Sequence, residues 1–596
     1  MDFRSSRFAS RSSRSALASL ASVLLPAAAL ALLSGCGSSM ATRRFPLRDA
    51  MWKDDDARPY RVDCTPDPKK PQHPVCAPEE YESPFVWDGV DAMLFHPVTR
   101  FFAVDPGGES VNVNALDEVP DSQWFTNRIG KAPMTADEVA KGWCDEHVLH
   151  PDDPDGSWVI DQGKENGANP GFRVNVPGVG KFLLKADEGD HPERATGATA
   201  IATRLYHAAG FWTGCDSVIY VRRSLLKLTP GLTHSDNTGV TRKFGEKQLD
   251  KVLNGAAKRG DLYRMMASKW LPGKTIGPFR YEDTRPDDPN DIIPHQDRRE
   301  LRGQRLLAAW IDHFDSREQN SMNTWMAVNA KEPDSSPGFI RHWIMDLNDC
   351  FGSEWQWDLL TRRINFSYYF DGGDVAQDFI TFGLFERPWD KLNRQPDGEI
   401  FGYYEADEFE AEGWKPGYQN PTFVRMTERD GAWMARILAR FGKEHVEAAV
   451  KVGDFTEPKH HAYLVRTMLQ RQRKILARYF GKVSPVTDLA VSGSELCGVD
   501  LARKTETYDA SRFRYSAVVN TGPDLEATQA AVVTPAAEGR VCVTLPRVGG
   551  DGGERDDSPL RYLVVKVHNG QADEPLRAHL YDLGPTKGYR LVGIER

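Results

Sequence analysis

The sequence lacks several features that would place it at once in a common functional class. After residue 35 it has no run approaching the roughly twenty apolar residues that a membrane-spanning helix needs. Its eight Cys show no Cys-x-x-Cys and no Cys/His pattern with zinc spacing. It also contains no G-x-G-x-x-G segment. These absences argue against a multi-span membrane protein, a zinc-binding domain and a conventional glycine-rich phosphate loop.

Basic residues are also fewer than acidic ones. The chain has 75 Lys and Arg against 85 Asp and Glu, a formal net charge of −10. Removing residues 1–35 takes away four Arg and one Asp, which leaves 71 basic and 84 acidic residues and a net charge of −13. An acidic exterior repels a phosphate backbone, so we expect no nucleic-acid partner.

The first 35 residues are typical of an export signal. Four Arg precede an apolar run from Ala16 to Leu33, which Pro26 interrupts. The sequence Leu-Ser-Gly-Cys then ends at Cys36 and resembles the lipobox of bacterial lipoproteins. That resemblance implies cleavage before Cys36 and a lipid anchor on it, and Gly37 favours the outer membrane, with the chain facing the periplasm or exterior. The alternative is an ordinary signal peptide with an incidental Cys.

Seven Cys follow Cys36, and in an exported protein most are expected to pair. We expect disulfides between Cys64 and Cys76 and between Cys497 and Cys542. Because seven is odd, one thiol must remain free. Connectivity does not otherwise follow from the sequence.

The segment from Trp310 to Gly352 carries the most chemical information. Residues 298–313 place apolar side chains on one helical stripe, so a buried helix is expected to end at a loop containing Asp315 and Asn320. The runs 324–328 and 339–345 predict two strands, with a polar turn rich in Pro, Gly and Ser between them. The second strand ends at Asp346, and Asp349 follows closely.

Upstream, short strands are predicted over 158–160, 172–176, 181–185 and 217–221, with a helix between the last two. Lys185 ends the third strand, and Glu193 lies in the first turn of that helix. On its own Lys185 would be interpreted as a surface lysine. Glu193 also has a structural explanation, because the helix dipole favours an acid in the first turn. The position of Lys185 ahead of the Asp315 unit favours a functional role instead.

At these residues the chain resembles the atypical branch of the protein-kinase superfamily, which includes HipA-like, CotH-like and phosphatidylinositol-kinase-like enzymes. The resemblance is confined to Lys185, Asp315, Asn320, Asp346 and their surroundings, within residues 158–480. It implies that Asp315 is the catalytic base for an acceptor hydroxyl. It also implies that Lys185 contacts the phosphates of ATP or another nucleotide and that Glu193 positions Lys185.

The resemblance further implies a site for Mg²⁺ or Mn²⁺. Asn320 and Asp346 would be its ligands, and Asp349 would be a third, because Asp-Cys-Phe-Gly mimics Asp-Phe-Gly with one insertion. Alternatively, one of these carboxylates caps a turn. Phe314 stands where kinases have the Arg of His-Arg-Asp, and no Ala-Pro-Glu follows Asp346, so a conventional activation loop is not expected.

The expected fold class is α+β, with a two-lobed kinase-like fold. The expected parts are an irregular extension over 36–150, a β-rich small lobe over 151–273, a mainly α large lobe over 274–485 and a β-sandwich-like domain over 486–596. The predicted function is phosphate transfer to an unidentified acceptor, a protein or a small molecule. The alternative is an inactive, kinase-shaped binding protein at the cell envelope.

Overall fold

The computed structural model describes residues 44–52, 54–67, 70–102, 108–144, 149, 152–164, 169–187, 191–235, 240–352, 358–548 and 554–596. The predicted signal peptide and Cys36 lie outside these residues. The chain divides into a short unit, Met1–Pro46, and a large one, Leu47–Arg596. The features below belong to the large unit, whose mixture of helices and antiparallel sheets confirms the predicted α+β class.

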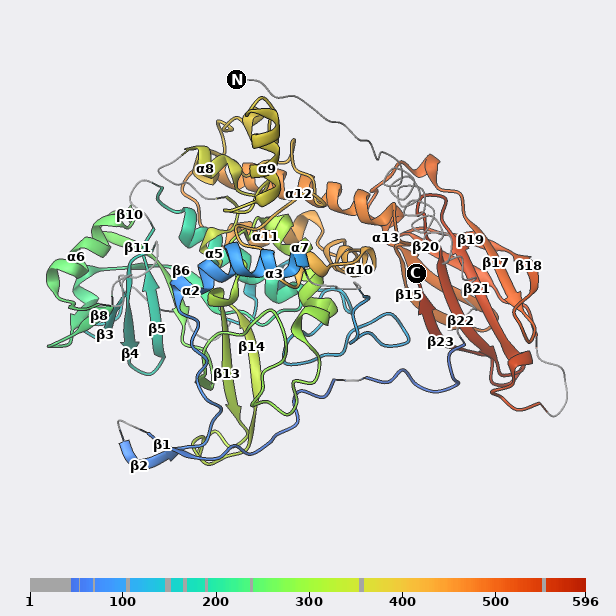
Figure 1. Cartoon of the computed structure of the whole chain (residues 1–596), viewed down its shortest axis with the longest axis horizontal. Helices are drawn as coiled ribbons and strands as arrows, with labels where there is room; N and C mark the ends of the chain where they lie inside the picture. Colours follow the sequence, from blue (N-terminus) through green and yellow to red (C-terminus); the bar gives the residue numbers. More distant parts are fainter. Residues whose placement is uncertain are drawn as a thin grey trace, which may run out of the picture. The chain divides into compact units, whose positions relative to one another are not determined.

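One sheet is built from strands that are distant in sequence (Figure 1). Its central order is β3-β4-β5-β11-β6, and every neighbouring pair in it is antiparallel. The strands are β3 (Trp158–Lys164), β4 (Gly171–Val176), β5 (Gly180–Lys185), β11 (Leu262–Lys269) and β6 (Cys215–Val221). The four predicted strands are confirmed, because alternating apolar residues such as Phe172, Val174 and Leu184 bury one face in a shared core.

Short elements border this sheet. At its edges lie β10 (Lys258–Arg259) beside β11 and β7 (Leu226–Leu228), which runs parallel to β3. The hairpin of β8 (Thr233–Ser235) and β9 (Thr241–Lys243) forms a separate pair. Helix α6 (Glu246–Gly255) adds Leu249, Val252 and Leu253 to the core of the sheet.

Helix α5 (Arg194–Ala209) connects β5 to β6 and is buried along almost its whole length. Its side chains are mostly Ala and Thr, which allow close approach of neighbouring elements. The prediction placed Glu193 inside this helix, whereas the structure places it at the N-cap with a φ of +73°.

Helix α7 (Arg299–Ile311) is the buried helix predicted before the Asp315 loop. Trp310 Nε1 donates to the carbonyl of Met468, 2.8 Å away, which fixes α7 against α12. Helices α10 (Glu428–Leu438), α11 (Lys443–Lys451) and α12 (Pro458–Phe480) share its core. The loop after α7 is therefore held on a rigid base.

The predicted hairpin follows this loop. It consists of β13 (Ser321–Ala327) and β14 (Gly338–Ile344), and β12 (Lys274–Thr275) adds a third strand. Helices α8 (Asp358–Arg363) and α9 (Gly372–Thr381) come next along the chain.

The N-terminal extension is more ordered than predicted. It contains α2 (Phe85–Val90), the π-helical turn η1 (Asp91–Phe95), α3 (His96–Phe102) and α4 (Ala136–Lys141), as well as the hairpin of β1 (Thr65–Asp67) and β2 (Lys70–Val75). The extension predicted as irregular thus includes a paired hairpin. Tertiary contacts stabilise these short elements, which have little periodicity of their own.

After α12 the chain forms two antiparallel sheets around one core. One has the order β15-β16-β20-β19 and the other β18-β17-β21-β22-β23. The strands are β15 (Val486–Ser492), β16 (Glu495–Asp500), β17 (Ser516–Thr521), β18 (Ala527–Ala531), β19 (Val533–Pro535), β20 (Arg540–Thr544), β21 (Tyr562–His568), β22 (Leu576–Asp582) and β23 (Tyr589–Glu595), with the turn of helix α13 (Leu501–Lys504) between β16 and β17. The predicted short strands of 486–596 are confirmed.

Three disulfides join described residues. Cys64–Cys76 and Cys497–Cys542 are the two predicted pairs, and Cys144–Cys215 is a third that the sequence left open. Among the described residues the other Cys is Cys350, a buried free thiol.

A buried ionic cluster holds the start of α7. The guanidinium of Arg298 is completely buried and contacts Asp54 at 2.5 Å, Asp291 at 3.4 Å and Glu300 at 3.5 Å. Replacement Arg298→Met would leave these carboxylates without their shared cation. We expect it to lower the free energy of unfolding by about 3–5 kcal/mol, measured by urea denaturation.

The matched control is Lys482→Ala. Lys482 pairs with Asp573 at 2.9 Å, but the two side chains are 51% and 65% exposed. Loss of such a pair should cost no more than about 1 kcal/mol. If both variants lost the same stability, the buried cluster would not be a principal source of stability for α7.

Candidate functional site

The site begins at the end of β5 with Lys185. Its Nζ forms an ion pair with Oδ1 of Asp346 over 2.7 Å, although the two residues are 161 positions apart. Lys185 is buried, whereas the Asp346 side chain is 41% exposed. The pair therefore joins the β3–β6 sheet to the segment that follows β14, with the carboxylate still accessible to a ligand.

Asp346 lies where the chain turns sharply after β14, with a φ of +53°. Arg194, the first residue of α5, holds the following turn by donating to the carbonyls of Asn348 at 3.3 Å and Gly352 at 3.1 Å. Burial alone would raise the pKa of Asp346, but Lys185 holds it below its ordinary value. Asp346 is thus a carboxylate anchored in its ionised form.

Asp315 and Asn320 form the second half of the site. Nδ2 of Asn320 donates to Oδ2 of Asp315 at 2.8 Å and to its carbonyl at 2.7 Å. The carbonyl of Asn320 accepts from the N–H of Met345 at 2.9 Å, which places the loop beside Asp346. Burial raises the pKa of Asp315 to about 6, and the charge of Asp346 adds to the increase. Lys185, Asp346, Asn320 and Asp315 are therefore brought together.

Glu193 is not part of this group. Its carboxylate accepts from the N–H of Thr456 at 2.9 Å and from the Thr456 hydroxyl. The left-handed backbone at Glu193 directs the side chain to Thr456, and its carboxylate forms no pair with Lys185. The prediction that Glu193 positions Lys185 is not supported by the geometry.

Asp349 is half-buried and ends the 3₁₀ turn Leu347–Asp349. Burial raises the pKa of the Tyr369 phenol, and the charges of Asp315 and Asp349 add to this effect. Asp349 therefore lies near the edge of the site.

Three residues that the sequence did not single out surround Lys185. Lys164, at the end of β3, has a pKa lowered to about 8 by burial and by the charge of Lys185. With the side-chain amide of Asn348 oriented so that its nitrogen faces Asp346, this nitrogen donates to Oδ1 of Asp346 over 2.8 Å. Asp216 on β6 is buried and feels the charge of Lys185. Lys164 and Asp216 lie near strand ends and Asn348 lies in the turn Leu347–Asp349, and these positions were the only signal available from the sequence.

Two histidines near the Asp315 loop and the β13–β14 hairpin are held in structural hydrogen bonds. His313 Nδ1 bonds the Tyr206 hydroxyl at 2.8 Å, and His342 Nδ1 bonds Oδ1 of Asn323 at 2.7 Å. Arg317 differs, because its guanidinium lies 3.1 Å from Asp315 and 3.3 Å from Asp88 of α2. It therefore links the Asp315 loop to the N-terminal extension.

The oxygen atoms around Asp346 suit a hard divalent cation. Asn320 uses its amide nitrogen on Asp315, which leaves its amide oxygen as a ligand, and Oδ2 of Asp346 is not the atom that bonds Lys185. One compact group of metal-type side chains occurs among the described residues, Glu495 with Cys497 and Cys542, but both sulfurs are in a disulfide. The Asn320–Asp346 region is thus the better fit for Mg²⁺ or Mn²⁺.

Comparisons of the chain with protein-family models, with curated proteins and with solved structures gave no match. Within the described residues, every helix is too short or too polar to cross a bilayer.

Proposed function

We propose that this protein is a nucleotide-dependent phosphotransferase. The observation that carries the proposal is the convergence of Lys185, Asp346, Asn320 and Asp315 from two separate parts of the chain. A buried ammonium suits nucleotide phosphates, an amide and a carboxylate suit a divalent cation, and a second carboxylate suits a base. Few other reactions need all four groups in one place.

The order of the strands supports a two-lobed, kinase-like fold as part of this proposal. The chain order β3-β4-β5-α5-β6, followed after β7 to β10 and α6 by β11, and the sheet order β3-β4-β5-β11-β6 resemble those expected for a kinase small lobe. A buried helix, an Asp loop, a hairpin and a strand ending in Asp follow in the order expected for the large lobe.

In the proposed reaction, the acceptor hydroxyl oxygen forms a bond to the terminal phosphorus of the nucleotide. The bond from that phosphorus to its bridging oxygen breaks, and the electron pair leaves with the nucleoside diphosphate. The hydroxyl proton passes to Asp315, while Lys185 pairs with the remaining phosphates. A bound Mg²⁺ or Mn²⁺, held by Asn320 and Asp346, would neutralise phosphate charge.

We also propose that the chain is an exported lipoprotein anchored through Cys36. The three disulfides support export, because such bonds persist in oxidising compartments and are rare in the cytosol. Mass spectrometry of the mature chain tests this point. A lipid-modified N-terminal Cys36 is expected, whereas cleavage at another residue would contradict the anchor.

Thermal unfolding with and without ATP tests the nucleotide site. ATP with Mg²⁺ or Mn²⁺ is expected to raise the unfolding temperature, because a ligand that binds only the folded state stabilises it. ATP with EDTA should give a smaller increase, since the cation ligands would then be unfilled. No increase with ATP under any of these conditions would contradict the proposed function.

The second candidate is a kinase-shaped protein without catalytic activity. Two observations favour it: Arg317 contacts the proposed base, Asp315, and Glu193 does not position Lys185. This candidate predicts nucleotide binding without phosphate transfer. Transfer of radiolabelled phosphate from ATP to water or to an acceptor separates the two.

A further inference from the structure

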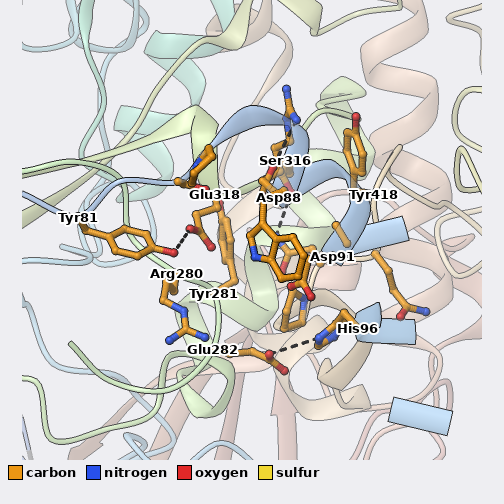
Figure 2. Close-up of a pocket in the computed structure, with 18 of the residues that line it drawn as sticks. Tyr81, Asp88, Asp91, His96, Arg280, Tyr281, Glu282, Ser316, Glu318 and Tyr418 are labelled. Carbon is orange, nitrogen blue, oxygen red and sulfur yellow. Dashed lines mark hydrogen bonds and ion pairs between the residues drawn. The ribbon is translucent and has the colours of Figure 1, made fainter. Parts of the chain in front are cut away.

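A cavity of about 290 Å³ lies directly beside the Asp315 loop. Ser316, Arg317 and Glu318, the three residues after Asp315, form one part of its lining. Helices α2 and η1 of the N-terminal extension form another part (Figure 2). A cavity of this size holds a small organic molecule rather than a folded partner.

Negative charge predominates around this cavity, which we call the loop cavity. Five of its lining residues carry carboxylates and two carry guanidinium groups: Glu82, Asp88, Asp91, Glu282 and Glu318 against Arg280 and Arg317. Arg317 is already engaged by Asp88 at 3.3 Å and by Asp315 at 3.1 Å. Glu282 lies 3.3 Å from Nδ1 of His96, and Glu318 accepts a hydrogen bond from the Tyr81 hydroxyl at 2.5 Å. The carboxylates of the loop cavity still outnumber its guanidinium groups.

Two polar groups of the loop cavity have unused bonding capacity. Asp91 forms no ion pair with any described residue, and Figure 2 shows it on the helical side of the cavity. Oε1 of Gln419 is buried and accepts no hydrogen bond from the part of the chain that the structure describes. Burial also raises the pKa of Asp88 and of Glu318, because the neighbouring groups that lower these pKa values do not outweigh the loss of water. Asp91 and Gln419 could each accept a hydrogen bond from an N–H⁺ donor.

Aromatic rings complete the lining. Tyr81, Trp87, Tyr281 and Tyr418 all contribute to it. The guanidinium of Arg317 already lies 4.9 Å from the centre of the Tyr418 ring, so one internal cation uses this aromatic surface. Aromatic faces combined with carboxylates are the recognition chemistry of organic cations, including quaternary ammonium groups.

We propose that the loop cavity binds the ammonium group of a small organic acceptor. This inference rests on the proposed function, since the acceptor would then present a hydroxyl group to Asp315. Asp91 and Gln419 receive the cation, and Trp87 and Tyr418 cover its apolar surface. The cation also competes with Arg317 for Asp88, and it thereby loosens the contact between Arg317 and the base.

Two pairs of probes test the charge requirement on the full chain. Choline is compared with its neutral analogue 3,3-dimethylbutan-1-ol, and ethanolamine with propan-1-ol, by calorimetry and by tryptophan fluorescence at low salt. Trp87 is 58% exposed at the cavity, so it should report binding. At least one cation should bind about tenfold more tightly than its neutral partner.

Two substitutions in the loop cavity test whether the cation binds there. Asp91→Asn should weaken cation binding about tenfold, and Trp87→Leu should weaken it through loss of the aromatic face. Asp137→Asn, at an exposed acid on α4, is the matched control and should leave binding unchanged. The inference is overturned if neither cation binds better than its neutral partner, or if Asp91→Asn and Asp137→Asn behave alike.

The thermal shift with ATP and Mg²⁺ is measured on the same samples. If cation binding fails while the ATP shift persists, the acceptor inference falls and the proposed function stands. If the unchanged protein shows no ATP shift, the proposed function itself falls.

Discussion

Asp315→Asn is expected to abolish phosphate transfer and to leave nucleotide binding intact. The amide has about the same size as the carboxylate, but it cannot take up the proton of the acceptor's hydroxyl group. Loss of a general base typically costs a factor of about 10²–10⁴ in rate. Initial rates of ADP release and the thermal shift with ATP and Mg²⁺ would measure the two effects separately.

The pH profile should identify the base. Burial raises the pKa of Asp315 to about 6, and only its ionised form can accept a proton. The rate should therefore be low below pH 6, rise through it and level off above. This rising limb should be missing from the residual activity of Asp315→Asn, because an amide does not titrate there.

The control for Asp315→Asn is Asp334→Asn, an exposed position between β13 and β14. It should leave rate and pH profile unchanged. Transfer that survives in Asp315→Asn at the level of the control would rule out Asp315 as the base. Transfer that is absent in the unchanged protein, despite nucleotide binding, would favour the inactive candidate.

Lys185→Met should produce the second large effect, a loss of nucleotide affinity. A hydrogen bond to a charged group contributes about 1.5–3 kcal/mol, so the dissociation constant for ATP should rise about 10–100-fold. The fold should tolerate the change, because the partner carboxylate of Asp346 is 41% exposed and can be hydrated. Calorimetric titration with ATP and Mg²⁺ gives the dissociation constant directly.

Lys181→Met is the matched control for Lys185→Met. Lys181 lies on the same strand, β5, but its side chain is exposed at the start of the strand. Nucleotide affinity should be unchanged in this variant. Equal losses in both variants would indicate a general effect of removing positive charge from β5, and would remove Lys185 from the site.

Local sequence patterns identified most of the scaffold. The helical stripe over 298–313 predicted α7, and the alternating runs on either side of the polar turn 331–338 predicted β13 and β14. These predictions succeeded because burial of one face selects for a period of 3.6 in a helix and of 2 in a strand. Asp315 comes directly after α7 along the chain, and Asp346 comes directly after β14.

The N-terminal extension shows where such patterns fail. Residues 85–102 have no clear apolar stripe, yet they are helical and Asp88 reaches Arg317 beside the proposed base. Isolated helices of this length are unstable in water, so only contacts with distant residues make them form. The loop cavity was invisible in the sequence for the same reason.

By itself the sequence determined the α+β class and the elements that flank Asp315 and Asp346, because composition and local periodicity encode them. Lys185, Asp315, Asn320 and Asp346 were singled out by a resemblance and not by periodicity. Only the tertiary structure decided that Lys185 pairs with Asp346, that Glu193 bonds Thr456 instead, and that α2 lies against the Asp315 loop. These are contacts between residues more than 150 positions apart. Packing of the whole chain sets them, and no local pattern encodes which distant side chain will be the partner.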